Sequence, residues 1–337
     1  MLEKPDLEDK RIIACLQNQY GLGVVQIDFL PLGADLNTAV YRIVTTGGIP
    51  YFCKLRRDRF DEASVAVPKF LSDLGFRQVI PPLRIQTGNL WAELDPFKVI
   101  LYPFVEGYDG FKVNLSDQHW VEFGKALKSF HSAVIPPSIA RGVPRETYSP
   151  KWREIVRSFL ARLEGEAFTE PVAGELAAFL KTKYAETQKL VARTERLAVT
   201  LQSQNPKSIL CHADIHVGNL LIGPKDELYL VDWDTLIFAP KERDLMFIGG
   251  GLGGGGHTPQ EEISLFYQGY GQTQIDPIAL AYYRCERIIE DIAVICEQVF
   301  LSEQGGQDRL QAIEYLKSNY LPEGTIELAY LSDITKL

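Results

Sequence analysis

Two short segments of the chain hold residue types that could carry out phosphoryl transfer. Residues 211–219 read CHADIHVGN, which places Asp214 and Asn219 five positions apart, and residues 231–234 read VDWD. Asp232 follows Asp214 by 18 positions. Phosphoryl transfer from a nucleotide needs one carboxylate that accepts a hydroxyl proton, together with an amide oxygen and a second carboxylate that hold Mg²⁺. The two segments contain this set of groups at a suitable spacing.

The segments beside these polar residues are short and apolar. Residues 208–211, 220–222 and 228–231 are predicted to form strands, because each is a brief apolar run bounded by turn-forming residues. The polar motif residues then fall in the loops between the strands. Loops anchored by short strands would therefore position the chemistry.

The N-terminal third of the chain has the pattern of a small sheet with helices beside it. Residues 6–20 place apolar side chains on one helical face, and Gly47 with Gly48 gives a hairpin turn signal. A second helix is predicted over 60–75, with Pro68 in its first turn or at a kink. The predicted strands of this region cover 24–30, 39–45, 51–55, 78–85, 90–93 and 98–104.

After residue 105 the pattern becomes helical. Apolar positions at helical spacing predict helices over 116–133, 151–163, 171–202, 259–271, 277–302 and 307–318. We therefore expect an α+β fold of two lobes. A small β-rich N-terminal lobe would span residues 1–105, and a larger, mostly helical C-terminal lobe would span residues 106–337. The glycine-rich residues 249–256 are predicted to connect two helices flexibly.

Composition limits the classes of partner and compartment. The chain has 337 residues and a formal net charge of −9, which argues against a nucleic-acid partner and is compatible with a cationic small molecule. Its five cysteines are dispersed, which favours free thiols in a reducing compartment. Neither a signal peptide nor an apolar run of about 18 residues is evident. We expect a cytoplasmic protein without membrane contact, and nothing in the sequence requires an obligatory protein partner.

The motif HADIHVGN followed by VDWD resembles the aminoglycoside phosphotransferase family, and the resemblance extends over roughly residues 20–300. This family shares a bilobal, protein-kinase-like fold with choline kinases and other small-molecule kinases. The whole chain looks most like the spectinomycin phosphotransferase branch. The resemblance implies an ATP-dependent enzyme that moves the γ-phosphoryl group to a hydroxyl of an aminocyclitol or aminoglycoside antibiotic. Spectinomycin is the expected substrate, and antibiotic resistance by O-phosphorylation is the expected result.

The resemblance also implies a role for each motif residue. Asp214 matches the catalytic aspartate, which accepts or orients the proton of the attacking hydroxyl. Asn219 and Asp232 match the magnesium ligands, and such hard oxygen ligands suit Mg²⁺. ATP and Mg²⁺ are accordingly the expected cofactors. His212 matches a histidine that supports the catalytic loop.

Lys54 lies in an apolar strand, where a lysine is unfavourable unless it meets negative charge. The resemblance implies that it binds the α- and β-phosphates and pairs with a glutamate of the next helix. Glu62, eight residues later at the start of that helix, is the best candidate for this partner. The alternative is an edge-strand lysine that points to water.

Residues 98–107, KVILYPFVEG, resemble the strand and hinge that join the two lobes. Tyr102 would lie at the end of the adenine pocket, and backbone groups of Pro103 and Val105 would hydrogen-bond the base. The alternative is an ordinary linker strand. Residues 32–37, LGADLN, take the place of the loop over the nucleotide, although one glycine there is equally compatible with a simple hairpin turn.

Acidic residues beyond the motifs are candidates for binding a cationic substrate. Family members bind cationic sugars with acidic side chains from this part of the chain, and a solvated helix face is the alternative for each. The candidates on the predicted helix over 277–302 are Glu286, Glu290 and Asp291. Trp233 and Asp234, directly after Asp232, are further candidates, with support of the metal site as the alternative for Asp234. Asp244 follows in a short KERDL segment and could be a helix N-cap.

Three other functions compete with this interpretation. The first is phosphorylation of a different small molecule, of the choline, homoserine or methylthio-sugar type. The second is a metal-dependent hydrolase built on His212, Asp214, His216 and Asp232, since such side chains can converge on one ion. That hypothesis leaves Lys54 and Asn219 unexplained. The third is a catalytically silent nucleotide-binding protein, against which the complete set of motif residues argues.

Overall fold

The computed structural model describes residues 3–33, 35, 37–57, 60–250, 256–302 and 305–332. The chain divides into two compact units, each assembled from three separate stretches. The first unit comprises Met1–Val113, Ser132–Pro144 and Val217–Leu236, and the second comprises Asn114–His131, Arg145–His216 and Ile237–Leu337. An antiparallel sheet dominates the first unit and helices dominate the second, which confirms the predicted α+β fold class.

The first unit is built on an antiparallel sheet of five strands in the order β1-β2-β3-β5-β4. Side chains alternate between the two faces of such a sheet. On β3, Cys53 and Leu55 accordingly enter the apolar core, whereas Lys54 between them faces the opposite side. The strands are β1 (Val24–Leu30), β2 (Thr38–Thr45), β3 (Pro50–Arg57), β4 (Ala92–Leu94) and β5 (Phe97–Pro103).

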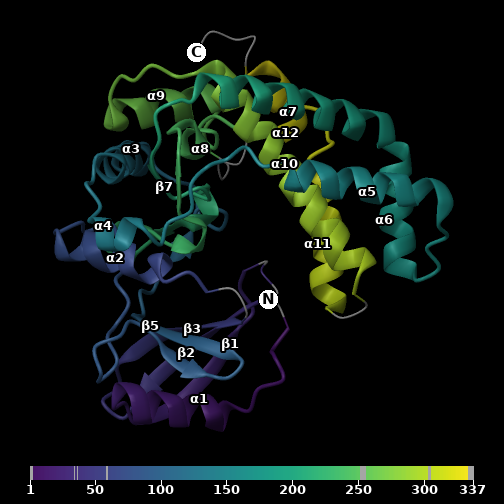
Figure 1. Cartoon of the computed structure of the whole chain (residues 1–337). Helices are drawn as coiled ribbons and strands as arrows, with labels where there is room; N and C mark the ends of the chain where they lie inside the picture. The colour runs from purple at the N-terminus through teal and green to yellow at the C-terminus, as the bar shows by residue number, and fades with distance from the viewer. Residues whose placement is uncertain are drawn as a thin grey trace. The chain divides into compact units, whose positions relative to one another are not determined.

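One face of this sheet is covered by the N-terminal helix α1 (Asp9–Cys15) and its π-helical continuation η1 (Leu16–Tyr20), as Figure 1 shows. Ile12 and Leu16 are fully buried in the core that the helix shares with β2, β3 and β5. Gly21 then adopts a φ of 70°, the left-handed conformation that ends many helices. The predicted helix over 6–20 is therefore present with a later start.

The predicted strand over 78–85 is wrong. Only Val79 forms an isolated bridge there, to Leu230. Pro81 and Pro82 have no N–H to donate, so this segment cannot form a regular ladder. The other predicted helix of this region is present as α2 (Ala63–Asp73), with Pro68 inside it.

A second, three-stranded sheet in the first unit carries one of the motif segments. Its strands are β6 (Tyr108–Asp109), β8 (Leu220–Ile222) and β9 (Leu228–Leu230), in the order β6-β8-β9. The 3-10 turn η2 (Val217–Asn219) precedes β8, and the 3-10 turn η3 (Trp233–Thr235) follows β9. The predicted arrangement of motif residues at the ends of short strands is therefore present in this unit.

The second unit is mainly helical and is built around the long helix α10 (Pro277–Phe300). Asp276 caps this helix by accepting hydrogen bonds from the backbone N–H groups of Ile278 and Ala279. The helices that share its main apolar core are α5 (Lys151–Gly165), α6 (Pro171–Thr182), α7 (Tyr184–Gln204), α11 (Gly306–Ser318) and α12 (Thr325–Leu331). The single predicted helix over 171–202 is thus two helices, α6 and α7, separated at Lys183.

The remaining elements of the second unit form a smaller group. Helices α3 (Asp117–His131) and α9 (Pro259–Tyr270) pack closely because Gly124 and Gly269 lie at their contact. A Cβ atom on Gly124 would lie 2.1 Å from the carbonyl oxygen of Phe266, so no larger residue fits there. The two-stranded sheet of β7 (Ile209–Cys211) and β10 (Ile237–Ala239) leads to the short helix α8 (Glu242–Leu245).

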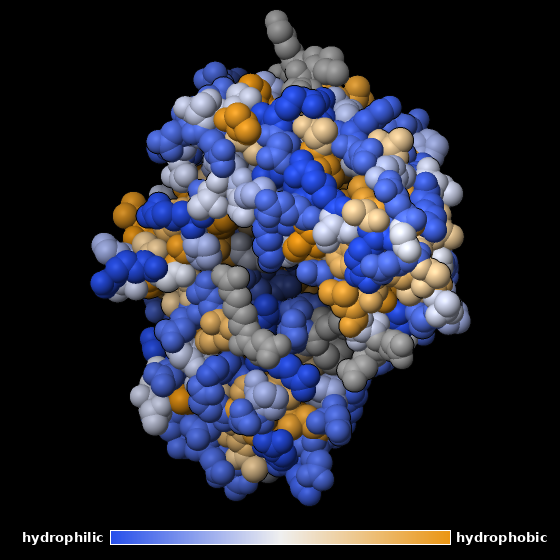
Figure 2. Space-filling model, turned by 45° about the vertical axis from the view of Figure 1, so that its right-hand side comes forward, coloured by the Kyte–Doolittle hydropathy of each residue, from blue (hydrophilic) through white to orange (hydrophobic). Residues whose placement is uncertain are grey.

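The surface shows no large apolar area on the face drawn in Figure 2, where orange residues lie in small, separate groups among blue ones. Among the residues that the structure describes, no helix has the length and apolarity needed to cross a membrane. The predicted nucleotide loop includes residues 34 and 36, and the predicted glycine-rich connection includes residues 251–255. Both sets lie outside the described residues.

Candidate active site

Lys54 is the central cation of a charged cluster in the first unit. Its side chain is only 10% exposed, and its Nζ lies 2.8 Å from Oδ1 of Asp232 and 2.7 Å from Oδ2 of Asp234. Burial alone would lower the pKa of Lys54, but the two carboxylates outweigh it and raise that pKa above its usual range. Lys54 is therefore positively charged and held among anions, and the alternative of a lysine pointing to water does not apply.

The two aspartates reach Lys54 because of the sharp turn that carries them. Asp232 has a φ of 61°, a left-handed conformation that starts the turn η3 immediately after β9. Trp233 anchors this turn, since it is 5% exposed and its indole N–H donates to the carbonyl oxygen of Leu230. The predicted substrate candidate Trp233 thus points into the interior, and Asp234 belongs to the cluster around Lys54.

Asn219 and Asp232 are brought together by the same small sheet. Leu220 on β8 pairs with Leu230 on β9, and the backbone N–H of Val231 donates to the carbonyl oxygen of Asn219 at 3.0 Å. Asn219 is buried, with 8% exposure, whereas the side chain of Asp232 is 49% exposed. An amide and a carboxylate are therefore held at neighbouring positions of one sheet.

The predicted pairing of Lys54 with Glu62 is not formed. Glu62 precedes α2 as an exposed N-cap residue, and within the described part of the chain no ion pair joins it to Lys54. Arg56, two residues along β3 and on the same face as Lys54, makes a further contact of 3.2 Å with Asp234. The counter-charges of Lys54 come from the VDWD segment rather than from α2.

The predicted hinge residues lie at the end of β5 in the first unit, with Tyr102 and Pro103 as its last two residues and Val105 just beyond it. Tyr102 lies opposite Phe52 on β3, and their rings meet edge to face with centroids 6.3 Å apart. Burial raises the pKa of the Tyr102 hydroxyl. Pro103 is exposed and Val105 is partly buried. Their backbone groups therefore lie near the surface, where a ligand could reach them.

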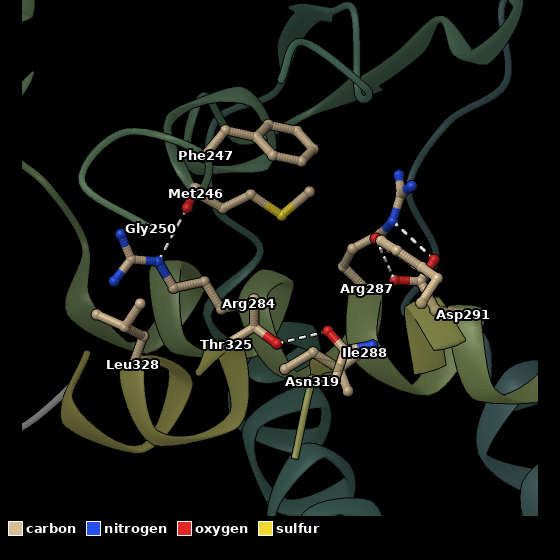
Figure 3. Close-up of a pocket in the computed structure, with 11 residues that line it drawn as sticks. Met246, Phe247, Gly250, Arg284, Arg287, Ile288, Asp291, Asn319, Thr325 and Leu328 are labelled. Carbon is tan, nitrogen blue, oxygen red and sulfur yellow. Dashed lines mark hydrogen bonds and ion pairs between the residues drawn. The ribbon is translucent and has the colours of Figure 1, made fainter. Parts of the chain in front are cut away.

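Asp214 lies in the second unit, where Arg287 of α10 binds its carboxylate. Arg287 Nη1 is 2.5 Å from Oδ1 of Asp214, and Nε is 3.1 Å from Oδ1 of Asp291. Tyr315 of α11 donates to Oδ2 of Asp291 at 3.3 Å. Figure 3 shows the pair formed by Arg287 and Asp291. Burial raises the pKa of Asp291 to about 6, and Arg287 partly offsets that effect.

A small cavity lies beside Arg287 and Asp291 (Figure 3). Its volume is about 30 Å³, and its wall includes Met246, Tyr315 and Asn319. A cavity of that size holds one or two water molecules and is too small for a sugar ring. Asp291, predicted as a substrate candidate, therefore lies beside a small cavity and pairs with an arginine.

The other two acidic candidates on α10 are also paired with arginines. Glu286 is 7% exposed and lies 2.5 Å from Arg153, so it is part of a buried ion pair. Burial raises the pKa of Glu286 to about 7. Glu290 lies 3.6 Å from Arg243. The description of these residues as a solvated helix face is therefore wrong for Glu286, which has a structural partner.

The backbone that carries Asp214 is held by Asp244. The carboxylate of Asp244 accepts hydrogen bonds from the backbone N–H groups of His212, at 2.9 Å, and Ala213, at 2.6 Å. Asp244 is fully buried, and although burial would raise its pKa, the hydrogen bond from His131 lowers it below the usual range. Asp244 is not the helix N-cap that was predicted, because it lies within α8 and supports the residues before Asp214.

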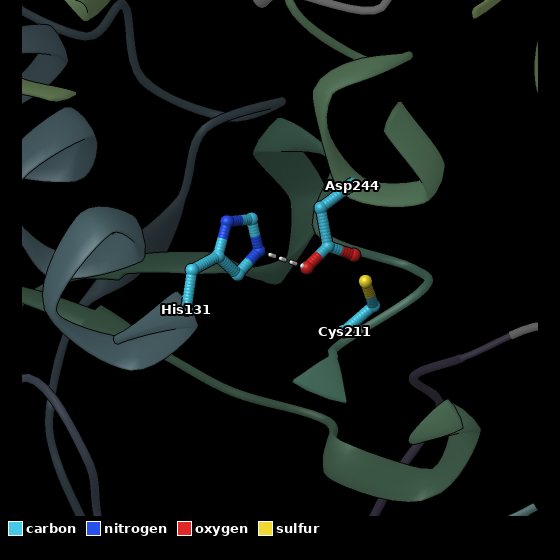
Figure 4. Close-up of side chains that lie close together, drawn as sticks. All are labelled: His131, Cys211 and Asp244. Atoms are coloured by element: carbon cyan, nitrogen blue, oxygen red, sulfur yellow. Dashed lines mark hydrogen bonds and ion pairs between the residues drawn. The ribbon is translucent and has the colours of Figure 1, made fainter. Parts of the chain in front are cut away.

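His131, Cys211 and Asp244 form a compact group beneath this backbone (Figure 4). Nε2 of His131 lies 2.8 Å from Oδ2 of Asp244, and its Nδ1 lies 2.8 Å from the hydroxyl of Tyr270. Burial raises the pKa of the Cys211 thiol well above its usual value, which disfavours the thiolate that a metal requires. The polar atoms of His131 and Asp244 already have partners, so this group supports the loop.

The hydrolase hypothesis receives no support from this geometry. Within residues that the structure describes, the side chains able to converge on one ion are His131, Cys211 and Asp244, and neither His212 nor His216 is among them. His212 is fully buried, and His216 lies 3.8 Å from Asp214.

Comparison with known families identifies the chain. Residues 28–274 match the model of the phosphotransferase enzyme family, which is more than half of the sequence. The chain belongs to the phosphotransferase enzyme family. This phosphotransferase is similar to a crystal structure of spectinomycin phosphotransferase, APH(9)-Ia, in complex with ADP and spectinomycin. The two share 36% sequence identity and a TM-score of 0.89, over 98% of this chain and 100% of the other.

Further relatives agree with this family membership. A crystal structure of the AMP-bound complex of the same spectinomycin phosphotransferase shares 35% identity, with a TM-score of 0.83 over 95% of this chain and 98% of the other. Protein StrN of Streptomyces griseus is 24% identical over 227 residues, which are 65% of this chain and 67% of StrN. Ethanolamine kinase of Plasmodium vivax, at 14% identity and a TM-score of 0.62 over 97% of this chain and 92% of the other, shares the fold.

Two contacts of the motif segment in this phosphotransferase were not predicted from the sequence, one with Arg287 and one with Asp244. Arg287 lies 73 positions after Asp214, and Asp244 lies 32 positions after His212. Arg287 follows Glu286 in a helix without any local motif, and the KERDL segment indicates Asp244 only as a possible helix N-cap. Both contacts are long-range, so local spacing could not reveal them.

Proposed function

We propose that this phosphotransferase uses ATP and Mg²⁺ to phosphorylate a hydroxyl of an aminocyclitol or aminoglycoside antibiotic, and that spectinomycin is the substrate. The observation that carries the proposal is the 36% identity, over 98% of the chain, with a spectinomycin phosphotransferase whose crystal structure contains ADP and spectinomycin. Antibiotic resistance by O-phosphorylation would be the consequence. Because ATP is the phosphoryl donor, the reaction would take place in the cytoplasm.

Lys54 is the residue that we assign to the nucleotide phosphates. It is a buried, charged lysine whose two partners are carboxylates, and Asp232 is 49% exposed. A phosphate group could therefore replace one of these partners at the Nζ atom without leaving either charge buried and unpaired. Tyr102, Pro103 and Val105 are assigned to the base, and Glu62 stays a candidate at the edge of this lobe, which we propose to span residues 1–105.

The residues around Lys54 also fit a magnesium ion. Asn219 and Asp232 offer an amide and a carboxylate oxygen from neighbouring positions, and Asp234 adds a third oxygen ligand 2.7 Å from Lys54. Hard oxygen ligands of this kind are those that Mg²⁺ prefers. Bound Mg²⁺ would supply positive charge that neutralises the phosphates. The basic and acidic groups of this chain would meanwhile orient the nucleotide.

Asp214 is assigned to the acceptor hydroxyl, within a lobe that we propose to span residues 106–337. Its carboxylate would accept the hydroxyl proton, or orient it, as the oxygen attacks phosphorus. Asp244 holds the backbone before it, which keeps the carboxylate in one place. Positioning and electrostatics would supply most of the rate enhancement.

A cationic acceptor suits the charge of the chain. The net charge is −9, and Asp214, Glu290 and Asp291 each lie on the second unit with part of the side chain exposed. An amine of the antibiotic would be attracted to such a surface. We therefore propose a small-molecule partner and neither nucleic acid, membrane nor an obligatory protein partner.

The deciding experiment is a coupled assay that measures ADP release with spectinomycin, several aminoglycosides, choline, homoserine and a methylthio-sugar. We expect turnover with spectinomycin at low substrate concentration, and phosphorylated spectinomycin detected by mass spectrometry. The Asp214→Asn variant serves as the blank for contaminating ATPase. Turnover with choline or another of these acceptors, and none with spectinomycin, would assign the enzyme to a different small-molecule kinase.

A further inference from the structure

Arg287 connects two carboxylates on opposite sides of its guanidinium group. It donates through Nη1 to Oδ1 of Asp214 and through Nε to Oδ1 of Asp291. A planar guanidinium with fixed donor directions sets the orientation of the groups that it binds, which a lysine ammonium does not do. The contact with Asp214 therefore fixes which oxygen of that carboxylate faces α10.

Arg287 is itself held in place by its surroundings. Asp291 lies one helical turn further along α10, and its other oxygen accepts from Tyr315 of α11. Only 24% of the Arg287 side chain is exposed. The neighbouring carboxylates raise the pKa of Arg287 well above its usual value although burial opposes this, so the group is always charged. The guanidinium is thus a fixed cation next to Asp214.

Arg287 adds a contact at the carboxylate of Asp214 to the contacts that hold its backbone. Asp244 holds the peptide groups of His212 and Ala213, which locates the Cα atom of Asp214. The last torsion of an aspartate side chain is broad, however, so a fixed backbone leaves the carboxylate free to turn. Arg287 at Oδ1 and His216, 3.8 Å from Oδ2, limit that rotation.

We infer that Arg287 is a positioning residue of the transfer reaction, which holds Oδ1 of Asp214 so that Oδ2 receives the proton of the acceptor hydroxyl. This inference rests on the proposed function. Asp291 has the supporting role of anchoring Arg287. The opposite possibility is that Arg287 blocks Asp214 until a cationic acceptor displaces it. The two possibilities predict opposite effects of removing the guanidinium.

Steady-state kinetics of the full-length Arg287→Met, Arg287→Lys and Arg157→Met variants separate them. Arg157 pairs with Glu195 at 2.9 Å on the exposed side of α5, so Arg157→Met is the matched control. We expect Arg287→Met to lower kcat about 100-fold, as small misplacements of catalytic groups do, with little change in the KM for ATP. Arg287→Lys should lower kcat less than Arg287→Met does, and Arg157→Met should leave kcat unchanged.

An unchanged or increased kcat in Arg287→Met, with a lower KM for the acceptor, would overturn the inference and show that Arg287 is a blocking group. ADP affinity by calorimetry and the unfolding temperature show whether a variant is folded. If Arg287→Met fails to fold, the kcat of Arg287→Lys decides between the positioning role and the blocking role. A thermal double-mutant cycle of Asp214→Asn with Arg287→Met tests the contact without any acceptor. Additive changes in stability would show that the two side chains do not interact, which would overturn the inference. Failure of the wild-type enzyme to phosphorylate any acceptor would overturn only the proposed function.

Discussion

The two charged clusters of this phosphotransferase are built in opposite ways. In the first unit one cation, Lys54, is surrounded by the carboxylates of Asp232 and Asp234. In the second unit one anion, Asp214, is held by the guanidinium of Arg287, and its backbone is held by Asp244. The first cluster stores a positive charge whose partners an anionic ligand can replace. The second fixes the orientation of a carboxylate.

This difference is consistent with the roles that we propose for the two clusters, nucleotide binding for the first and catalysis for the second. A binding cluster benefits from partners that can be exchanged, and Asp232 is half exposed. A catalytic carboxylate benefits from fixed partners, because proton transfer depends on geometry more than on affinity. Substitutions in the first cluster should therefore change nucleotide affinity. Substitutions in the second should change turnover.

The largest expected effect comes from Asp214→Ala. If Asp214 accepts the hydroxyl proton as proposed, its loss should lower kcat by about 10²- to 10⁴-fold. Nucleotide affinity should stay near that of the wild type, since no residue of the Lys54 cluster is changed. Stopped-flow or coupled assays give kcat, and calorimetry with ADP gives the affinity. A variant that turns over at nearly the wild-type rate would remove the catalytic role of Asp214 and, with it, the contrast between the two clusters.

Asp244→Ala should have the next largest effect, on stability. Asp244 is fully buried, and its loss leaves the N–H groups of His212 and Ala213 without an acceptor. We expect a loss of about 3 kcal/mol in the free energy of unfolding, from buried donors left unsatisfied. The matched control is Asp276→Ala, which also removes an acceptor from two N–H groups but at a helix start that water can reach. The control should lose about 1 kcal/mol.

Urea unfolding measures both of these losses. Equal losses in Asp244→Ala and Asp276→Ala would mean that burial beneath the segment before Asp214 has no special effect. In that case the loop before Asp214 would be held by other contacts, and the contrast between an exchangeable and a fixed cluster would weaken.

Lys54→Met should weaken nucleotide binding and leave the fold largely intact. Removing the cation that would meet the phosphates should lower ADP affinity about 30-fold, equivalent to about 2 kcal/mol. Asp232 is half exposed, so water can solvate its carboxylate in the variant. Lys54→Arg keeps the charge and is the control, for which calorimetry should show a smaller loss. Unchanged ADP affinity in Lys54→Met would show that the cluster does not bind phosphate.

The sequence predicts the first cluster better than the second for a physical reason. Strand alternation places Lys54 on the face opposite Cys53 and Leu55, and the short apolar runs place Asn219 and Asp232 at the ends of β8 and β9. These are local effects with a fixed period. The sequence nevertheless predicts Glu62 as the partner of Lys54, because residue spacing does not show the path of the chain after β9. The structure places Asp232 and Asp234 there instead.

The second cluster depends on contacts between distant segments. Arg287 and Asp291 show only the one-turn spacing of an ion pair on a helix, which is common on solvated surfaces. Nothing local indicates that Asp214, 73 residues earlier, meets that pair. The family resemblance makes Asp291 a substrate candidate, and the structure adds that it pairs with Arg287. Long-range packing of α10 decides this, and it is not encoded in any short motif.

Asp291→Asn should have the smallest effect, which is a pH-dependent change in the free energy of unfolding. Burial raises the pKa of Asp291 to about 6, above its value in an unfolded chain, even though Arg287 favours the ionised form. Stability from this group is therefore fully present below the unfolded pKa and is lost as the pH rises through about 6. Ionised Glu290 and Asp214 add to the penalty. Asp291→Asn removes the ionisation and should be more stable than the wild type at pH 8 by about 1 kcal/mol.

The same variant should lose turnover, because a neutral amide anchors Arg287 less firmly than a carboxylate does. Urea unfolding at pH 5 and pH 8, together with kcat at pH 8, tests both halves of this expectation. A gain in stability with a loss of turnover means that the enzyme keeps a destabilising charge because that charge orients Arg287, and through it Asp214. If Asp291→Asn were instead less stable at pH 8, the pair would serve the fold, and the second cluster would resemble the ordinary ion pairs elsewhere on the helices.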